Sequence, residues 1–128
     1  MNLLTFQPKL GHLTTFGGHP VNCAASLATL KELLSTDIMN EVEKKEMLFR
    51  KHLVHPKIKK IRGKGLMLAI ELDNEKIAQR VVEESLEKRL ILFYFLFSKT
   101  SIRITPPLTI SNEEIIKGCE IIKGILEN

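Results

Sequence analysis

The sequence predicts an α+β fold in which a small, mostly antiparallel sheet carries helices on one face. Two short apolar runs, 58–62 and 66–72, are joined by Gly63-Lys64-Gly65, a spacing typical of a β-hairpin. Apolar stripes with helical period come before and after this hairpin. The chain has 128 residues and is 44% hydrophobic, which is enough to bury the core that this arrangement needs.

The chain opens without a helical or strand period. Residues 1–19 contain one proline and three glycines, so we expect an extended lead-in and loop that continues a structure upstream. Residues 20–128 then form the domain itself. Pro20 is well placed as the first residue of a helix, and apolar residues at helical spacing extend this helix through Leu34.

Four apolar residues on one helical face predict a second helix that ends before Pro56: Ile38, Val42, Phe49 and Leu53. The charged residues between them, including Lys45, are expected on its solvated face.

After the hairpin, residues 74–89 are predicted to be a helix and 90–97, which are entirely apolar, a central strand of the sheet. Residues 101–105 form a shorter strand with Ile102 and Ile104 on one face. In the predicted helix 74–89, three apolar side chains are expected to face the core: Ile77, Val81 and Leu86.

The last helix has the clearest start signal. Ser111 is followed by Glu114 in a capping-box pattern. One apolar stripe follows, widened by two further isoleucines: Ile115, Cys119, Ile122 and Leu126, with Ile116 and Ile125.

Composition excludes several classes of protein. The longest apolar run is too short to span a bilayer, and the opening residues do not form a signal peptide, so we expect a cytoplasmic protein without membrane contact. Cys23 and Cys119 are far apart in sequence, which favours two buried reduced thiols. His19 and Cys23 are four residues apart, but a third ligand is not evident, and no metal site is expected.

The formal charge of +4 raises the possibility of a nucleic-acid surface. Its densest basic segment, Lys57 to Lys64, alternates partly with Ile58 and Ile61, which predicts a strand edge with a solvated outer face. A small basic nucleic-acid binder is therefore one hypothesis for this chain, ranked below the two given at the end of this section. Only 5% of the residues are aromatic, so the chain has few side chains that could stack on bases.

Two segments carry chemistry. Thr14-Thr15-Phe16-Gly17-Gly18 places hydroxyls and glycines just ahead of a helix start, a setting suited to a phosphate, although Gly-Gly before a helix is also an ordinary turn. Arg103 lies between two inward isoleucines and therefore points away from the core. Its guanidinium is suited to binding a carboxylate through two parallel hydrogen bonds, although a solvated strand arginine is the simpler interpretation.

The Thr14–Gly18 segment, the Ile102–Thr109 segment with Arg103 and a double proline, and the Gly63–Glu71 stretch between them resemble the C-terminal part of class III pyridoxal-phosphate (PLP)-dependent aminotransferases, the ornithine and acetylornithine aminotransferase relatives. The resemblance implies the small domain of the aspartate-aminotransferase-like (type I PLP) fold. It implies that Thr15 contacts the cofactor phosphate of the partner subunit across a homodimer, and that Arg103 binds the carboxylate of the amino acid or of 2-oxoglutarate.

In that family the Schiff-base lysine lies upstream of the segment that Thr15 belongs to, in the large PLP-binding domain. The resemblance therefore implies that residues 1–128 contain no catalytic residue, bind no PLP alone and are inactive by themselves. It does not separate ornithine from acetylornithine or other amino donors. The alternative hypothesis is a stand-alone α+β interaction module that binds no cofactor.

Overall fold

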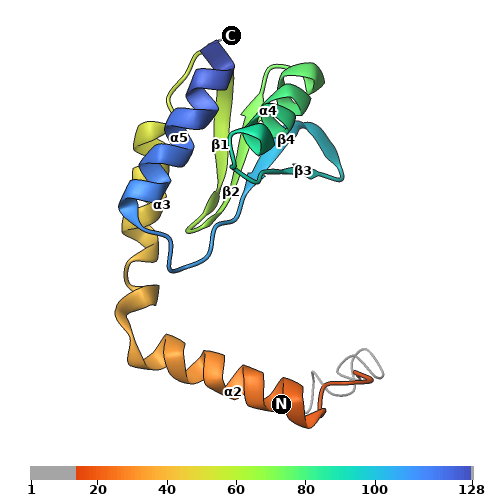
Figure 1. Ribbon diagram of the computed structural model, residues 1–128, viewed down its shortest axis with the longest axis vertical. Helices are drawn as coiled ribbons and strands as arrows, with labels where there is room; N and C mark the ends of the chain where they lie inside the picture. Colours follow the sequence, from red (N-terminus) through yellow and green to blue (C-terminus); the bar gives the residue numbers. More distant parts are fainter. Residues whose placement is uncertain (1–13, 128) are drawn as a thin grey trace. The chain divides into compact units, whose positions relative to one another are not determined.

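A computed structural model of the chain describes residues 14–127, which belong to two compact units, residues 1–37 and 38–128. The first unit contains the predicted helix α2 (Pro20–Ser35), drawn in orange and red in Figure 1. His19 caps this helix, because its Nδ1 atom accepts a hydrogen bond of 3.3 Å from the Val21 N–H. No residue of α2 is buried.

The elements that follow form an α+β arrangement, as predicted (Figure 1). They are η1 (Asp37–Met39), α3 (Val42–His52), β1 (Ile58–Lys64), β2 (Met67–Leu72), α4 (Glu75–Glu87), β3 (Phe93–Phe95), β4 (Ser98–Ile104) and α5 (Asn112–Glu127). Among residues 14–127, no helix is both long enough and apolar enough to cross a bilayer.

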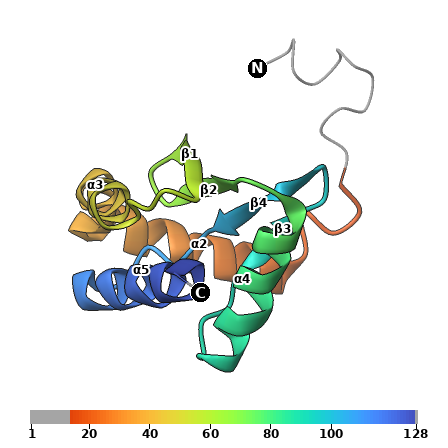
Figure 2. The ribbon, with the colours of Figure 1, turned by 90° about the horizontal axis from the view of Figure 1, so that it is seen from above.

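The four strands pair antiparallel in the order β1-β2-β4-β3, which Figure 2 shows from above. The predicted hairpin is present, with Lys64 paired to Met67 at its end. Gly63 and Gly65 both have positive φ, 115° and 59°, which explains why this tight turn contains two glycines. β1 is an edge strand whose basic residues are mostly exposed, as the alternation of the 57–64 segment predicted.

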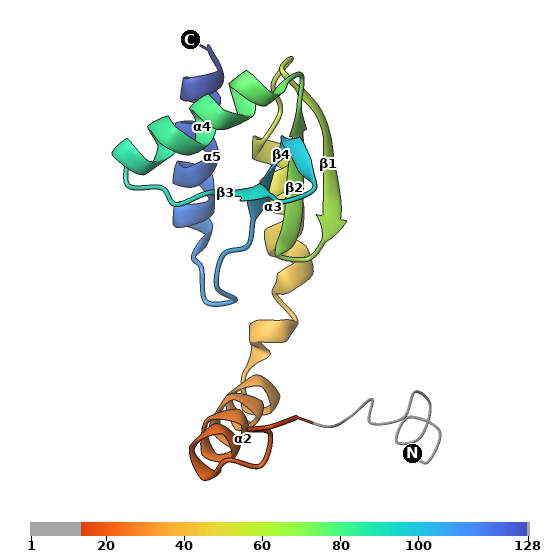
Figure 3. The ribbon, with the colours of Figure 1, turned by 90° about the vertical axis from the view of Figure 1, so that its right-hand side faces the viewer.

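One face of the sheet is buried beneath helices. Figure 3 shows α4 and α5 on the same side of the strands. β2 and β4 supply the strand half of the core: Leu68, Ile70, Leu72, Ile102 and Ile104. α5 contributes the predicted stripe, and its capping box is formed, with Glu114 N–H donating to Ser111 Oγ (3.2 Å) and Ser111 N–H to Glu114 Oε2 (2.8 Å).

The prediction of a central strand at 90–97 is wrong. Only Phe93–Phe95 is a strand, and it lies at the edge of the sheet, while the shorter predicted strand is central as β4. Leu92 reaches the core before the strand begins. Leu96 and Phe97 form the turn into β4 and are 92% and 100% exposed. The apolar run therefore spans a core position, an edge strand and an exposed turn in succession, and is not one buried strand.

Two helix-face predictions are also wrong. Leu86 is exposed, because it follows the buried Val81 by five residues, whereas the inward position four residues on is taken by Ser85. Lys45 is buried rather than solvated. Its ammonium donates to the Leu108 carbonyl oxygen (2.7 Å) and lies 3.7 Å from the Glu41 carboxylate. This lysine ties α3 to the segment that follows β4.

One of the two cysteines is buried and the other is exposed. Cys119 is buried as predicted, and burial raises the pKa of its thiol to about 11. Cys23 is exposed, contrary to the expectation of two buried thiols, because α2 has no buried face within its own unit.

Candidate functional site

The arginine predicted to bind a carboxylate lies on a central strand. Arg103 of β4 is directly opposite Ala69 of β2 and Phe93 of β3. Its neighbours Ile102 and Ile104 are buried, and side chains alternate along a strand. Arg103 is therefore exposed on the sheet face away from the core, the face that the sequence pattern predicts.

The guanidinium of Arg103 lies over an aromatic ring, 5.0 Å from the centroid of Phe93. Within the part of the chain that the structure describes, it makes no hydrogen bond or ion pair. Arg62 on the same face differs, because its Nε is 3.3 Å from Glu71 Oε2 and its Nη2 is 3.4 Å from Ser101 Oγ. All the N–H donors of Arg103 are therefore available to a ligand, whereas Arg62 already has a carboxylate partner.

A groove of about 380 Å³ runs along this face and includes Arg103 in its lining. Its other charged residue is the paired Arg62, and most of the remaining lining is apolar, including Met67, Ala69 and Phe95. A pocket with apolar walls and one free guanidinium suits a small carboxylate that also has an apolar part.

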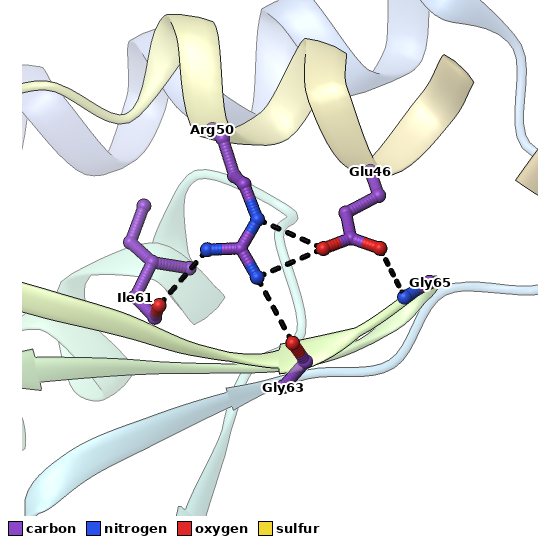
Figure 4. Close-up of polar contacts among 5 residues, drawn as sticks. All are labelled: Glu46, Arg50, Ile61, Gly63 and Gly65. Carbon is purple, nitrogen blue, oxygen red and sulfur yellow. Dashed lines mark hydrogen bonds and ion pairs between the residues drawn. The ribbon is translucent and has the colours of Figure 1, made fainter. Parts of the chain in front are cut away.

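The end of the β1–β2 hairpin, which forms one wall of this groove, is clamped from α3 (Figure 4). Arg50 Nη1 and Nη2 donate to the carbonyl oxygens of Ile61 and Gly63, each at 2.9 Å. Glu46 Oε1 accepts from Arg50 Nε and Nη2 at 2.8 Å, while Oε2 accepts from the Gly65 N–H. Two side chains one helical turn apart thus satisfy three backbone groups of the turn.

Because of these contacts, the contribution of Glu46 to the stability of the fold depends on pH. The hydrogen bond from Gly65 N–H, followed by the one from Arg50, lowers the pKa of this carboxyl below its ordinary value of 4.5. A carboxyl with a lowered folded-state pKa stabilises the fold above its unfolded pKa, and this stabilisation is lost as the pH falls through the folded-state pKa.

We therefore expect Glu46→Gln to lower the free energy of unfolding by about 1–3 kcal/mol at pH 7, because the amide has only one acceptor oxygen: one of the two contacts becomes a neutral hydrogen bond and the other is lost. Urea unfolding between pH 7 and pH 3 tests this, and the difference from wild type should shrink below about pH 4.5. Glu120→Gln, at an exposed position of α5, is the control and should show no such change. A Glu46→Gln difference that is independent of pH would contradict the role given to the carboxylate.

The second predicted site residue, Thr15, belongs to the unit of residues 1–37, where the loop ahead of α2 is held by the helix itself. His19 N–H and Asn22 Nδ2 both donate to the Phe16 carbonyl oxygen, at 3.1 and 3.2 Å. The Cys23 thiol lies 3.7 Å from the Gly17 carbonyl oxygen. The Thr15 side chain is exposed and makes no hydrogen bond within the described residues.

Two glycines and the start of α2 follow Thr15. A Cβ on Gly17 would come within 2.1 Å of Thr14 Oγ1, so this turn is suited to glycine, and Gly18 borders open space. The first turn of α2 contains no acidic residue to repel an anion. However, the Val21 N–H already donates to His19. This N–H is therefore not available to an anion at the helix start.

Thr15 and Arg103 belong to different units. In residues 14–127, no three His, Cys, Asp or Glu side chains are grouped to hold a metal ion. Sequence reasoning did not find Phe93 beneath Arg103, because it placed this residue in a buried strand. It also missed the clamp, although the Glu46–Arg50 spacing of four residues was a usable signal.

Residues 2–126 match the profile of the aminotransferase class-III family. The chain is 38% identical over 126 residues to the acetylornithine aminotransferase of Caldanaerobacter subterraneus subsp. tengcongensis, a match that covers 94% of this chain and 31% of that protein. The chain therefore spans about a third of the length of this curated relative.

Solved structures agree. The acetylornithine aminotransferase from Elizabethkingia anophelis superposes with a TM-score of 0.77 and 33% identity, covering 91% of this chain and 32% of that one. The ornithine aminotransferase from Toxoplasma gondii, described with partial occupancy of PLP at its active site, gives a TM-score of 0.75 and 31% identity, covering 99% of this chain and 31% of that one.

Proposed function

We propose, since the chain belongs to the class III aminotransferase family, that it forms the C-terminal domain of an enzyme that transfers an amino group from a diamino acid such as ornithine or acetylornithine to 2-oxoglutarate. The family is PLP-dependent. The observation that carries the proposal is the free guanidinium of Arg103 in a groove with mostly apolar lining. The names of the relatives support the class of amino donor.

In this proposal Arg103 binds the substrate carboxylate. The guanidinium presents parallel N–H donors that match the two oxygens of a carboxylate. β4 is paired with β2 on one side and β3 on the other, which fixes the position of the Arg103 backbone. Both an amino acid and an oxo acid carry such a carboxylate, so one arginine serves both half-reactions. Holding this group orients the substrate carbon that must react.

Thr15 is proposed to donate its hydroxyl to the phosphate of PLP that is bound mainly by the other subunit of a homodimer. PLP, when bound, supplies an electron sink for the amino-group transfer. The lysine that the cofactor needs, and the other residues around its ring, are proposed to come from a large domain outside these 128 residues. The isolated chain would then be inactive and retain no PLP.

We expect Thr15→Val in the complete enzyme to weaken PLP binding roughly 10- to 100-fold, because a hydrogen bond to a charged phosphate is lost while side-chain size is kept. Thr15→Ser, which keeps the hydroxyl, should bind PLP nearly as wild type does. The measurement is PLP release during dialysis, followed by absorbance. Equal retention by the valine and serine variants would contradict the proposed contact.

Hybrid dimers test whether Thr15 acts across the interface. One subunit carries Thr15→Val, and the other lacks the large-domain lysine. If the contact is made in trans, the subunit with the lysine receives its threonine from the partner, and the hybrid keeps one site of normal PLP affinity. If the contact is made within one subunit, that site is weakened.

A further inference from the structure

The aromatic ring under Arg103 belongs to a residue whose position is set by the sheet. Phe93 and Arg103 are directly opposite each other in the β3–β4 register, so their side chains lie on the same face. The guanidinium lies 5.0 Å from the ring centroid, within the range of a cation–π contact. Leu92, the residue before Phe93, is buried in the core and anchors the start of β3.

This contact has a specific consequence for Arg103. An arginine on a strand face has many rotamers, and here no hydrogen bond or ion pair within residues 14–127 selects among them. A ring beneath the guanidinium favours the positions in which the cation lies over the π face. It does so without occupying any N–H donor, so the donors stay free for a carboxylate. An ion pair, such as the one at Arg62, would occupy them.

We propose that Phe93 is a positioning residue for carboxylate binding: its ring holds the Arg103 guanidinium in place for the substrate. This inference rests on the proposed function, in which Arg103 is the carboxylate ligand. The neighbouring aromatic residues do not share this role. Tyr94 directs its hydroxyl toward the Gln79 carbonyl oxygen of α4 (3.4 Å), and Phe95 is paired with Ser98, not with Arg103.

The test is steady-state kinetics of the complete enzyme with Phe93→Leu, which keeps an apolar side chain and removes the ring. We expect KM for the carboxylate-containing donor to rise about 3- to 10-fold with kcat nearly unchanged. Phe93→Tyr, which keeps the ring, should restore KM to near the wild-type value. The matched control is Tyr94→Leu, the next aromatic of β3, which should leave KM unchanged.

A double-mutant cycle separates positioning from a structural effect. With Arg103→Met already present, Phe93→Leu should raise KM no further, because the cation that the ring holds is gone. Phe93 is 51% exposed, so the leucine variant should fold, and Phe93→Met is a second ring-free variant that should behave in the same way. Full additivity of the two substitutions would overturn the inference.

The same measurements distinguish this inference from the proposed function. If Arg103→Met leaves KM unchanged, the carboxylate role of Arg103 fails, and the inference fails with it. If Arg103→Met raises KM but neither Phe93→Leu nor Phe93→Met does, the proposed function stands and the positioning role of Phe93 is wrong.

Discussion

We expect Arg103→Met in the complete enzyme to lower kcat/KM for amino donors that carry a carboxylate by roughly 30- to 5,000-fold. Methionine keeps an unbranched side chain but removes every N–H donor. Truncating one partner of a desolvated, hydrogen-bonded charge pair costs about 2–5 kcal/mol, and this loss applies to the substrate in the transition state. Steady-state kinetics with acetylornithine and ornithine as donors, at saturating 2-oxoglutarate, measure it.

Two controls make this result specific. Arg62→Met removes a guanidinium from the same groove, but this arginine is already paired with Glu71, so its effect should be small. For a primary amine without a carboxylate, kcat/KM should fall far less with Arg103→Met than it does for the amino acids, because this ratio reports only the half-reaction with the donor. If kcat/KM falls equally for the amine and the amino acids, Arg103 does not act through the donor carboxylate.

We expect Gly63→Ala to destabilise the protein by about 3–5 kcal/mol, a large part of the total stability of a small domain. Gly63 has a φ of 115°, which L-residues rarely adopt, and a Cβ there would come within 2.0 Å of the Met67 carbonyl oxygen. The Met67 carbonyl oxygen is a backbone atom of the same hairpin, so only a shift of the hairpin backbone could remove the clash. Urea or thermal unfolding of the 128-residue chain measures the effect.

The control for this substitution is Gly118→Ala in α5. A Cβ there would meet only Leu90 Cδ1 at 3.8 Å, an ordinary contact, and alanine favours a helix over glycine by up to about 1 kcal/mol. Gly118→Ala should therefore stabilise the fold slightly. A Gly63→Ala protein within about 0.5 kcal/mol of wild type would show that the hairpin end adapts, contrary to this account.

Elements marked by local signals were predictable from the sequence. Pro20 at a helix start, the Ser111–Glu114 capping box and the two glycines of the hairpin each specify the backbone within a few residues, and all three predictions are confirmed. Strand order was less accessible. β4 pairs with β2 on one side and with β3 on the other, which places β3 at the edge of the sheet. An apolar run such as 90–97 does not indicate which strands pair with each other.

The candidate site shows the same division. Alternation between Ile102 and Ile104 predicted the face of Arg103, because strand periodicity is local. The ring of Phe93 beneath it depends on the β3–β4 register and could not be read from the sequence. Lys45 resembled any helix-surface lysine, and only the fold brings the Leu108 carbonyl oxygen to its ammonium.

In the proposed enzyme, this chain supplies substrate and phosphate contacts, and the cofactor-binding lysine lies outside it. The most direct measurement titrates PLP into the purified 128-residue chain, follows the visible spectrum, and then adds ornithine or acetylornithine with 2-oxoglutarate. The account predicts no saturable band that the amino donor discharges and no turnover, with both restored when the large domain is present. A discharged band from the isolated chain would contradict it, because a functional lysine would then lie within these residues.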